Sequence, residues 1–221
     1  MKTFEKLNRR HFNAIALGAC ATGFWPASAQ AQAREPVVLI VGDSLSAEYG
    51  LRRGAGWVAL LEARLVAERK TARVVNASIS GDTTAGGRSR LPALLRTHQP
   101  DVVVIELGGN DALRGLPLQM TRDNLRTMVQ ASQQAGARVL LVGMEMPPNY
   151  GARHAEEFRQ VFVDVARSEN VPLVPFFLKG VADGPDPLAL FQSDRIHPNE
   201  AAQPIMLDNV WPSLRQLLAR G

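Results

Sequence analysis

The chain alternates short, strongly apolar runs with longer stretches of helical character, and this alternation limits the folds open to it more than any other feature. Runs rich in Val, Ile and Leu predict five strands at residues 37–41, 73–77, 102–107, 138–143 and 171–174. Helices are predicted near residues 57–68, 89–97, 121–134, 155–169 and 200–219. Such alternation favours an α/β fold, with a five-stranded parallel sheet covered by helices on both faces.

The first apolar run stops abruptly at Gly42-Asp43-Ser44. Open α/β sheets place their chemistry at the carboxyl ends of the strands, so the Ser44 hydroxyl is a candidate nucleophile. Gly, Asp and Ser are also ordinary turn residues, and the tripeptide alone is equally compatible with a structural turn. A catalytic serine further needs a base to take its proton and usually a third group to orient that base.

Histidine is the expected base, and the chain has four histidines. His11 falls in the N-terminal leader discussed below, His98 at the solvated end of a predicted helix, and His154 in the exposed first turn of another. His197 instead lies in a polar loop, F-Q-S-D-R-I-H-P-N, with Asp194 three residues before it. One loop can thus carry both a base and the carboxylate that fixes its tautomer. A helix N-cap with an incidental aspartate is the alternative.

Two further strand ends offer hydrogen-bond donors for the negative oxygen that forms when a carbonyl is attacked. The strand at residues 73–77 is followed by Ser-Ile-Ser-Gly81-Asp, where glycine lets a backbone N–H approach a ligand closely. The strand at residues 102–107 is followed by Gly-Gly-Asn110-Asp, whose amide can donate to an oxyanion. Each segment taken separately is equally explained as a strand-to-helix turn.

Together these segments resemble the SGNH (GDSL) hydrolases, and within them the bacterial periplasmic arylesterase, acyl-CoA thioesterase I and lysophospholipase group. The resemblance covers most of the chain beyond the leader and rests on G-D-S-L-S-A-E-Y-G, V-V-N-A-S-I-S-G-D-T-T, L-P-A-L-L, V-V-I-E-L-G-G-N-D-A-L-R-G, P-P-N-Y-G, V-P-L-V-P-F-F and I-H-P-N-E-A-A-Q-P. It implies a three-layer α/β/α flavodoxin-like fold. The segment G-D-S-L-S also lacks the final glycine of the G-x-S-x-G turn of α/β-hydrolases, because Ser46 stands there.

The resemblance implies Ser44 as nucleophile, His197 as base and Asp194 as the residue that orients the base. It also implies an oxyanion hole formed by the N–H groups of Ser44 and Gly81 and by the Asn110 side chain. The sequence departs from the usual motifs of this family at two positions: Glu48, where the family often has a small residue, and Arg195, where it often has glycine. Both positions lie near the expected cleft, so they bear on substrate preference more than on mechanism.

The segment Leu113-Arg114-Gly115 follows the expected oxyanion asparagine and combines apolar and flexible residues. We expect it to contact the acyl part of the substrate, although an ordinary linker into the next helix would have the same composition. The segment at residues 144–148, M-E-M-P-P, is a second candidate for the cleft lining, with core packing as its alternative.

The first 33 residues have the features of an export signal, with basic residues before an apolar stretch and several A-x-A sites up to Ala33. The apolar stretch is too short for a stable membrane span. Arg9-Arg10 resembles a twin-arginine signal, and L-G-A-C at Cys20 also fits a lipid-anchored lipoprotein. We favour a released periplasmic protein with one domain at residues 34–221.

Charge and cysteine content exclude several classes of function. The formal charge of +4 falls to +1 without the leader, which carries four basic residues and one acid, so no nucleic-acid partner is expected. Cys20 is the only cysteine, so the remaining chain has neither a disulfide nor a thiolate metal site. The resemblance implies no metal and no organic cofactor.

These observations predict a serine hydrolase of esters, thioesters or lysophospholipids that acts through an acyl-enzyme. Two alternatives stay open. An acyltransferase or carbohydrate deacetylase would keep the same nucleophile, and a noncatalytic flavodoxin-like module would bind a phosphate or flavin at the strand ends. The second alternative leaves Asp194, His197 and Asn110 without a role.

Overall fold

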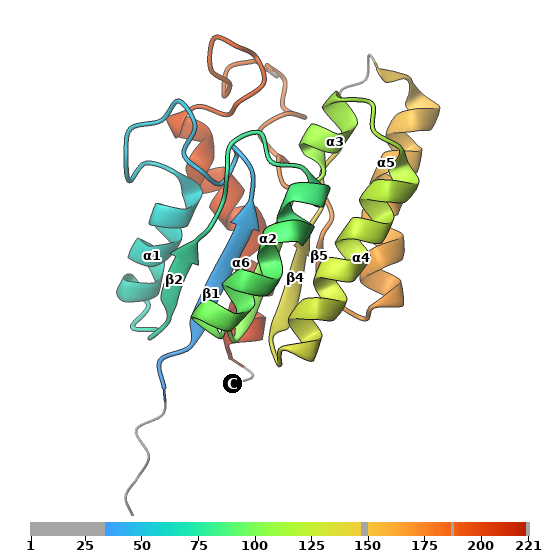
Figure 1. The fold of residues 1–221 in the computed structure, drawn as a ribbon. Helices are drawn as coiled ribbons and strands as arrows, with labels where there is room; N and C mark the ends of the chain where they lie inside the picture. The colour runs from blue at the N-terminus through green and yellow to red at the C-terminus, as the bar shows by residue number, and fades with distance from the viewer. Residues whose placement is uncertain (1–33, 147–149, 187, 220–221) are drawn as a thin grey trace, which may run out of the picture. The chain divides into compact units, whose positions relative to one another are not determined.

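The computed structural model describes residues 34–146, 150–186 and 188–219, and these form one three-layer α/β/α unit (Figure 1). Five parallel strands form its sheet in the order β2-β1-β3-β4-β5. Their bounds are β1 Val37–Gly42, β2 Arg73–Asn76, β3 Val102–Glu106, β4 Arg138–Val142 and β5 Leu173–Val174. The predicted five-stranded parallel sheet is therefore confirmed, and each strand lies within one or two residues of its expected bounds.

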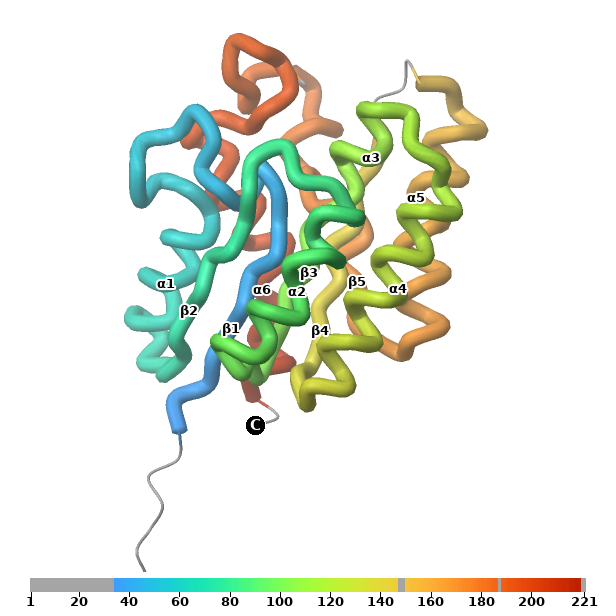
Figure 2. The backbone as a smooth tube through the Cα atoms, in the orientation of Figure 1, coloured from blue at the N-terminus to red at the C-terminus, as the bar shows by residue number. Residues whose placement is uncertain are grey.

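Six α-helices cover the sheet within the described residues. They are α1 Trp57–Ala67, α2 Thr84–His98, α3 Gly109–Leu113, α4 Leu118–Gln134, α5 Ala152–Ser168 and α6 Gln203–Leu218. A short 3-10 turn at Glu200–Ala202 precedes α6. In Figure 2, α2 and α4 lie in front of the sheet and α6 lies behind it.

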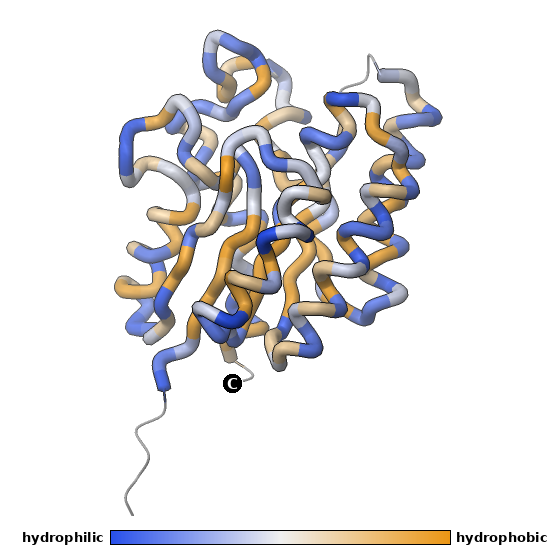
Figure 3. The backbone as a smooth tube through the Cα atoms, in the orientation of Figure 1, coloured by the Kyte–Doolittle hydropathy of each residue, from blue (hydrophilic) through white to orange (hydrophobic). Residues whose placement is uncertain are grey.

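Alternating strand residues divide the core into two apolar layers. Val38 and Ile40 of β1 pack on the side of α1 and α6, whereas Leu39 and Val41 pack on the side of α2, α4 and α5. This is the burial expected where successive side chains of a central strand point to opposite faces, both of them covered. The strands accordingly form the most hydrophobic part of the backbone trace (Figure 3).

The start of α2 differs from the prediction, because the helix begins at Thr84 and not near residue 89. Thr83 caps it by accepting a hydrogen bond from Gly86 N, and two glycines fill the first turns. A Cβ on Gly87 would lie 2.3 Å from Leu107 Cδ1, so glycine is what lets α2 pack closely on the sheet. Gly87 is thus required by helix packing.

The last helix, α6, packs along α1 and contacts β4 and β5, and its apolar residues share one core layer with Val38 and Ile40 of β1. The loop before α6 reaches the carboxyl end of β1. No helix in the described ranges is long and apolar enough to cross a membrane. The expected export signal, including Arg9-Arg10 and Cys20, lies outside the described residues.

Candidate active site

The candidate site lies where β1, β2 and β3 end, and Ser44 stands in a tight turn just after β1. The N–H groups of Ser46 and Ala47 donate to the Asp43 carbonyl at 3.2 and 3.0 Å, which closes one helical turn around Ser44. A Cβ on Gly42 would come within 2.7 Å of Glu106 Oε2 and 2.8 Å of Ser46 Oγ. Glycine at this position therefore allows the turn to sit close to β3.

The loop before α6 brings the expected base and carboxylate to this serine. The Nε2 atom of His197 lies 2.9 Å from Ser44 Oγ, and its Nδ1 atom lies 2.7 Å from Asp194 Oδ2. Both distances are within hydrogen-bond range. The three residues predicted from the sequence therefore converge in one relay, although Ser44 and His197 are 153 positions apart.

Asp194 is organised to remain ionised. Its Oδ1 atom accepts the backbone N–H groups of His197 at 3.0 Å and Ile196 at 2.9 Å, while Oδ2 faces the imidazole. These contacts, above all the backbone hydrogen bond from His197, lower the pKa of Asp194 to about 2. A carboxylate that stays charged can fix the His197 tautomer and support the imidazolium that forms during proton transfer.

The same loop turns sharply between Asp194 and His197. Arg195 has a φ of 60°, in the left-handed region that favours glycine. Glycine would adopt this conformation without steric cost. The loop is further fixed by Gln192 N, which donates to the His197 carbonyl at 2.8 Å, and by an isolated bridge between Phe191 and Pro198.

Tyr49 is a site residue that the sequence analysis did not identify. Its ring packs against the His197 imidazole, with centroids 4.3 Å apart. The neighbouring Glu48 also has a positive φ, of 58°, and its carboxylate accepts the N–H groups of Gly54 and Gly56. Glu48 thus braces the loop that carries Tyr49, and does not place a free charge in the cleft.

The loops that carry the three expected oxyanion donors meet at the end of β1, where Asn110 is bonded to Asp43 and Ile79 N, two residues before Gly81, donates to the Gly42 carbonyl at 3.1 Å. Among the described residues, the backbone N–H groups of Ser44 and Gly81 have no hydrogen-bond acceptor. Gly81 has a φ of 77°, a conformation that glycine adopts readily. Asn110 Nδ2 donates to Asp43 Oδ2 at 2.9 Å, which uses one of its two hydrogens. The second hydrogen has no acceptor among the described residues.

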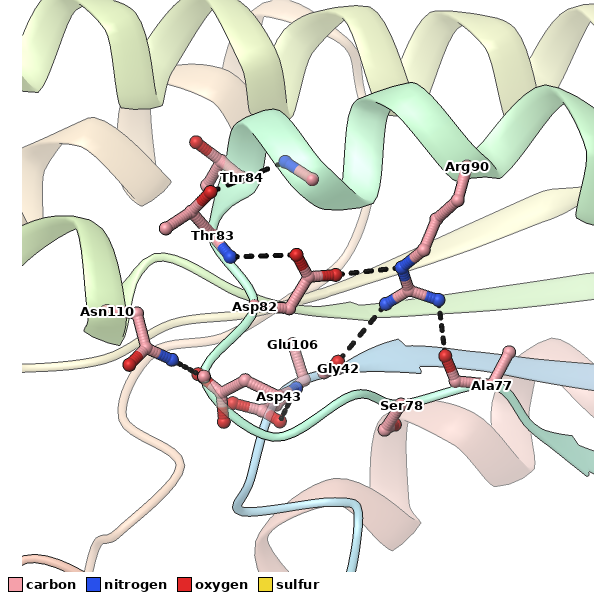
Figure 4. A network of polar contacts seen from close by, with 12 residues as sticks. Gly42, Asp43, Ala77, Ser78, Asp82, Thr83, Thr84, Arg90, Glu106 and Asn110 are labelled. Carbon is pink, nitrogen blue, oxygen red and sulfur yellow. Dashed lines mark hydrogen bonds and ion pairs between the residues drawn. The ribbon is translucent and has the colours of Figure 1, made fainter.

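An arginine network fixes the loops that carry these donors (Figure 4). Arg90 of α2 donates to the Gly42 carbonyl at 3.2 Å, to the Ala77 carbonyl and to Asp82 Oδ2 at 2.8 Å. One guanidinium therefore ties together the ends of β1 and β2 and the loop after Gly81. Sequence reasoning gave no role to Arg90, because an arginine in a helical stretch looks like an ordinary surface residue.

A buried carboxyl pair lies directly under the turn that carries Ser44. Asp43 N donates to Glu106 Oε2 at 3.4 Å, and Ser46 Oγ donates to the same oxygen at 2.7 Å. Burial raises the pKa of Asp43 to about 6 and raises that of Glu106 well above its usual range. The sequence gave no sign that either carboxyl would be buried.

The expected acyl-contacting segment lies beside the hole. Leu113 is exposed, and Arg114 Nη2 donates to the Gly81 carbonyl at 2.7 Å. Gly115 adopts a positive φ of 63°. Met144 and Met146 pack in the apolar core, and Pro147 and Pro148 lie outside the described residues.

Two other features bear on alternative sites. A surface hollow of about 560 Å³ lies between the end of α1 and the start of β2, at the edge of the sheet away from Ser44. Its lining has no pairing of a nucleophile with a base. The described part of the chain has no group of three or more His, Cys, Asp or Glu side chains placed to bind a metal ion.

Comparison with known proteins places this geometry in a family. The model of the GDSL-like lipase/acylhydrolase family matches residues 40–204. Esterase TesA of Pseudomonas aeruginosa is 54% identical over 187 residues, which cover 85% of this chain and 92% of that protein. Thioesterase 1/protease 1/lysophospholipase L1 of Escherichia coli is 46% identical over 181 residues, or 82% of this chain and 84% of that protein.

A solved structure agrees with these sequence matches. The crystal structure of the psychrotrophic esterase EstA from Pseudoalteromonas sp., inhibited by monoethylphosphonate, superposes with a TM-score of 0.78 at 41% identity. The match covers 84% of this chain and all of that one. The chain therefore belongs to the GDSL-like lipase/acylhydrolase family.

Proposed function

We propose that this protein is a serine hydrolase of carboxylic esters and thioesters that acts through an acyl-enzyme on Ser44. The observation that carries the proposal is the relay from Ser44 Oγ to His197 Nε2 at 2.9 Å and from His197 Nδ1 to Asp194 Oδ2 at 2.7 Å. A base within hydrogen-bond reach of a hydroxyl, and itself oriented by a carboxylate, is the arrangement that activates a serine.

In the first half of the reaction, His197 takes the Ser44 proton as Oγ attacks the substrate carbonyl carbon. The tetrahedral intermediate collapses, and His197 gives the proton to the departing alcohol or thiol. The acyl group is then joined to Ser44 Oγ as an ester. In the second half, His197 activates a water molecule, which releases the acid and regenerates the Ser44 hydroxyl.

The negative charge that develops on the carbonyl oxygen would be stabilised by the N–H groups of Ser44 and Gly81 and by the Asn110 amide. The two backbone donors lack acceptors within the described residues, which supports this assignment. Donors already in place cost no reorganisation when the charge appears, and each contributes roughly 2.7–4 kcal/mol to transition-state stabilisation.

The substrates that we propose are small aryl or alkyl esters, acyl-thioesters and lysophospholipids. The names of the relatives support these classes, since one is an esterase and another a thioesterase and lysophospholipase. Apolar side chains exposed beside the relay suit an acyl chain or an aryl group: Tyr49 is 50% exposed, Ile79 52%, Leu113 46% and Ile196 52%. Leu113, Arg114 and Gly115 would contact this part of the substrate.

We further propose that residues 34–221 are one hydrolase domain that works in the periplasm after an export signal at residues 1–33 is removed. The basic and apolar pattern of the leader supports export. Mass spectrometry of the mature N-terminus checks this, because release after Ala29, Ala31 or Ala33 and lipidation of Cys20 give different termini. A terminus on unmodified Met1 in the exported fraction would contradict the proposal.

The decisive experiment for the function compares Ser44→Ala with Ser89→Ala on a chromogenic short-chain ester. Ser89 is exposed on α2, away from the relay, so its variant should keep full activity. Ser44→Ala should lose activity on the order of 10⁵-fold or more, as expected when the nucleophile is removed. Near-normal turnover by Ser44→Ala would refute the proposal. Product analysis with sugar acceptors present distinguishes hydrolysis from acyl transfer.

A further inference from the structure

Two buried carboxyl groups beside Ser44 have no part in the mechanism described above. Asp43 and Glu106 are each only 3% exposed. They lie next to one another because residue 42 of β1 pairs with Glu106 of β3 in the parallel register. Burying a carboxyl group costs several kcal/mol unless its polar atoms are satisfied, so the contacts of this pair indicate what it does.

The contacts of Asp43 are those of an ionised carboxylate. Its Oδ1 accepts Leu45 N at 3.0 Å, and its Oδ2 accepts Asn110 Nδ2 at 2.9 Å. Both oxygens are thus occupied by donors, which an acceptor-only carboxylate satisfies best. Asp43 follows β1 directly and precedes Ser44, so the bond to Asn110 links the oxyanion donor of α3 to the nucleophile turn.

The bond to Asp43 also decides where the Asn110 amide points. The torsion at the end of an asparagine side chain is broad and only weakly restrained by its own geometry. With one amide hydrogen bound to Asp43 Oδ2, the plane of the amide is fixed and the second hydrogen keeps one direction. Without that bond, the amide would be free to rotate away from a carbonyl oxygen held at Ser44.

In the described residues, Glu106 accepts hydrogen bonds on one oxygen only, Oε2, from Ser46 Oγ and Asp43 N, so Oε1 is the oxygen left to carry a proton. Ser46 Oγ donates to its Oε2 at 2.7 Å, and Trp57 Nε1 donates in turn to Ser46 Oγ at 3.1 Å. In the described part of the chain, neither carboxyl of the pair is hydrogen-bonded to a lysine or arginine. Two adjacent buried carboxylates without a cation are strongly unfavourable, so one of them keeps a proton.

The charged groups around the pair favour a proton on Glu106. His197 attracts negative charge on Asp43, and Asp82 opposes it, although Asp82 is paired with Arg90 at 2.8 Å. Burial, and then the charge of Asp43, raises the pKa of Glu106 well above its usual range, and hydrogen bonds from Ser46 Oγ and Asp43 N oppose this. At neutral pH the pair therefore carries one negative charge, on Asp43.

We propose that ionised Asp43 is a positioning residue that orients the Asn110 amide toward the oxyanion, while Glu106 stays protonated behind it. The inference rests on the proposed function, because it concerns the oxyanion hole of that reaction. Asp43 acts through Asn110 and does not touch the substrate. Any loss of activity on changing Asp43 should therefore require Asn110.

A double-mutant cycle tests this dependence. Asp43→Asn puts an amide where two donors must be accepted, so at least one of the two bonds is lost. We expect kcat to fall on the order of 10- to 100-fold, the usual cost of removing a group that orients a functional side chain, with KM changed less than about threefold. Asn110→Ala should lower kcat about 10²- to 10³-fold. The double variant should be no slower than Asn110→Ala alone, because the losses are not independent.

Two results of the cycle would overturn the proposal. One is a kcat of Asp43→Asn within about twofold of the starting protein, and the other is a double variant whose losses multiply. Asp208→Asn provides the matched control, since Asp208 is an exposed carboxylate on α6 that pairs with Arg64. It should leave kcat unchanged. If Ser44→Ala keeps its activity, the proposed function fails; if only the cycle fails, the hydrolase assignment stands without this role for Asp43.

A pH comparison tests the same role without any change at Asp43, and so does not depend on whether Asp43→Asn folds. The quantity compared is the ratio of kcat for the starting protein to kcat for Asn110→Ala. His197 ionises in both proteins, so its effect on kcat cancels in this ratio. Protonating Asp43 releases Asn110, so this ratio should shrink as pH falls through about 6. A ratio that stays constant between pH 8 and pH 5 would contradict the proposal, because this range extends about one to two pH units on either side of the Asp43 pKa.

Glu106→Gln tests the protonation of the second carboxyl. A neutral amide replaces a neutral acid of similar shape, so kcat/KM should stay within about threefold of the starting value. Infrared spectroscopy at neutral pH should show a protonated-carboxyl C=O band that this variant loses. If the band is missing from the starting protein, or is unchanged in Glu106→Gln, Glu106 is ionised and the proposed charge distribution is wrong.

Discussion

The ring of Tyr49 packs against the imidazole of His197, with ring centroids 4.3 Å apart and planes inclined by 41°. His197 is therefore restrained from three directions, by Ser44, by Asp194 and by this aromatic face. The contact joins the loop after β1 to the loop before α6. It fixes the plane of the base without using either of its nitrogen atoms.

This contact predicts different results for two substitutions of Tyr49. Tyr49→Phe keeps the ring and should retain kcat within about twofold, because the hydroxyl takes no part in the packing. Tyr49→Ala removes an aromatic contact of about 0.5–1.5 kcal/mol and should lower kcat roughly 2- to 10-fold. Steady-state kinetics on a chromogenic ester measure both, and equal kcat values for the two variants would show that the ring does not orient His197.

The positive φ of Arg195 predicts that glycine can replace it in the catalytic loop without loss of activity. Its φ of 60° costs an ordinary residue roughly 1–2 kcal/mol, which glycine avoids. Arg195→Gly should therefore keep kcat. Its free energy of unfolding should be unchanged or raised by at most about 1 kcal/mol, because the larger loss of chain entropy of glycine offsets part of the relieved strain. Arg195→Val should lower both, because a β-branched residue disfavours this conformation. Chemical denaturation measures the free energy of unfolding of the two variants, and steady-state kinetics measure their kcat.

The lowered pKa of Asp194 predicts that its contribution to the stability of the protein depends on pH. Its pKa of about 2 lies below the ordinary value of 3.8, so its contribution to stability is present above about pH 4 and disappears as pH falls through about 2. Asp194→Asn should thus lower the melting temperature at pH 7 more than at pH 2. At pH 7 the variant should also lose about 10³- to 10⁴-fold in kcat, because the amide no longer fixes the productive His197 tautomer. A melting-temperature difference that is equal at both pH values would contradict the assignment.

The three contacts of the Arg90 guanidinium predict that positive charge alone cannot replace it. Arg90→Lys keeps the charge, but a single ammonium does not match the fork geometry that reaches Gly42, Ala77 and Asp82 together. We expect kcat to fall about tenfold as the Gly81 loop loosens, together with a lower melting temperature. Arg88→Lys on the exposed face of α2 is the matched control and should match the starting protein in both measurements. Full activity in Arg90→Lys would show that the network does not position the loop.

Much of this fold was predictable because its signals are local. The β-branched run at Val37–Gly42 is apolar at every position, as a central parallel strand requires, whereas the edge strand β2 has polar residues, Arg73 and Asn76, at its two ends. The convergence of Ser44, Asp194 and His197 was also expected, because the segments that carry them resemble those of the SGNH hydrolases. The roles of these residues stay predictions until the variants are measured.

The parts that were missed depend on contacts between distant segments. The start of α2 was predicted about five residues late, near residue 89, because the close approach of Leu107 to Gly87 cannot be seen in sequence. The short helix α3 was not predicted, and its Asp111 accepts hydrogen bonds from two distant residues, Thr84 Oγ1 at 2.5 Å and Thr121 Oγ1 at 3.3 Å. Tyr49, Arg90 and the buried Asp43–Glu106 pair likewise gain their roles only from neighbours that the fold supplies.

The central claim is that Ser44 is the residue that carries the acyl group. Peptide mass spectrometry after treatment with a serine-directed phosphonate tests it most directly, with Ser44→Ala and Ser89→Ala treated alongside. We predict one phosphonyl group on the peptide that contains Ser44, in the starting protein and in Ser89→Ala, and none in Ser44→Ala. Equal labelling of Ser44→Ala, or a label on another residue of the starting protein, would contradict the account.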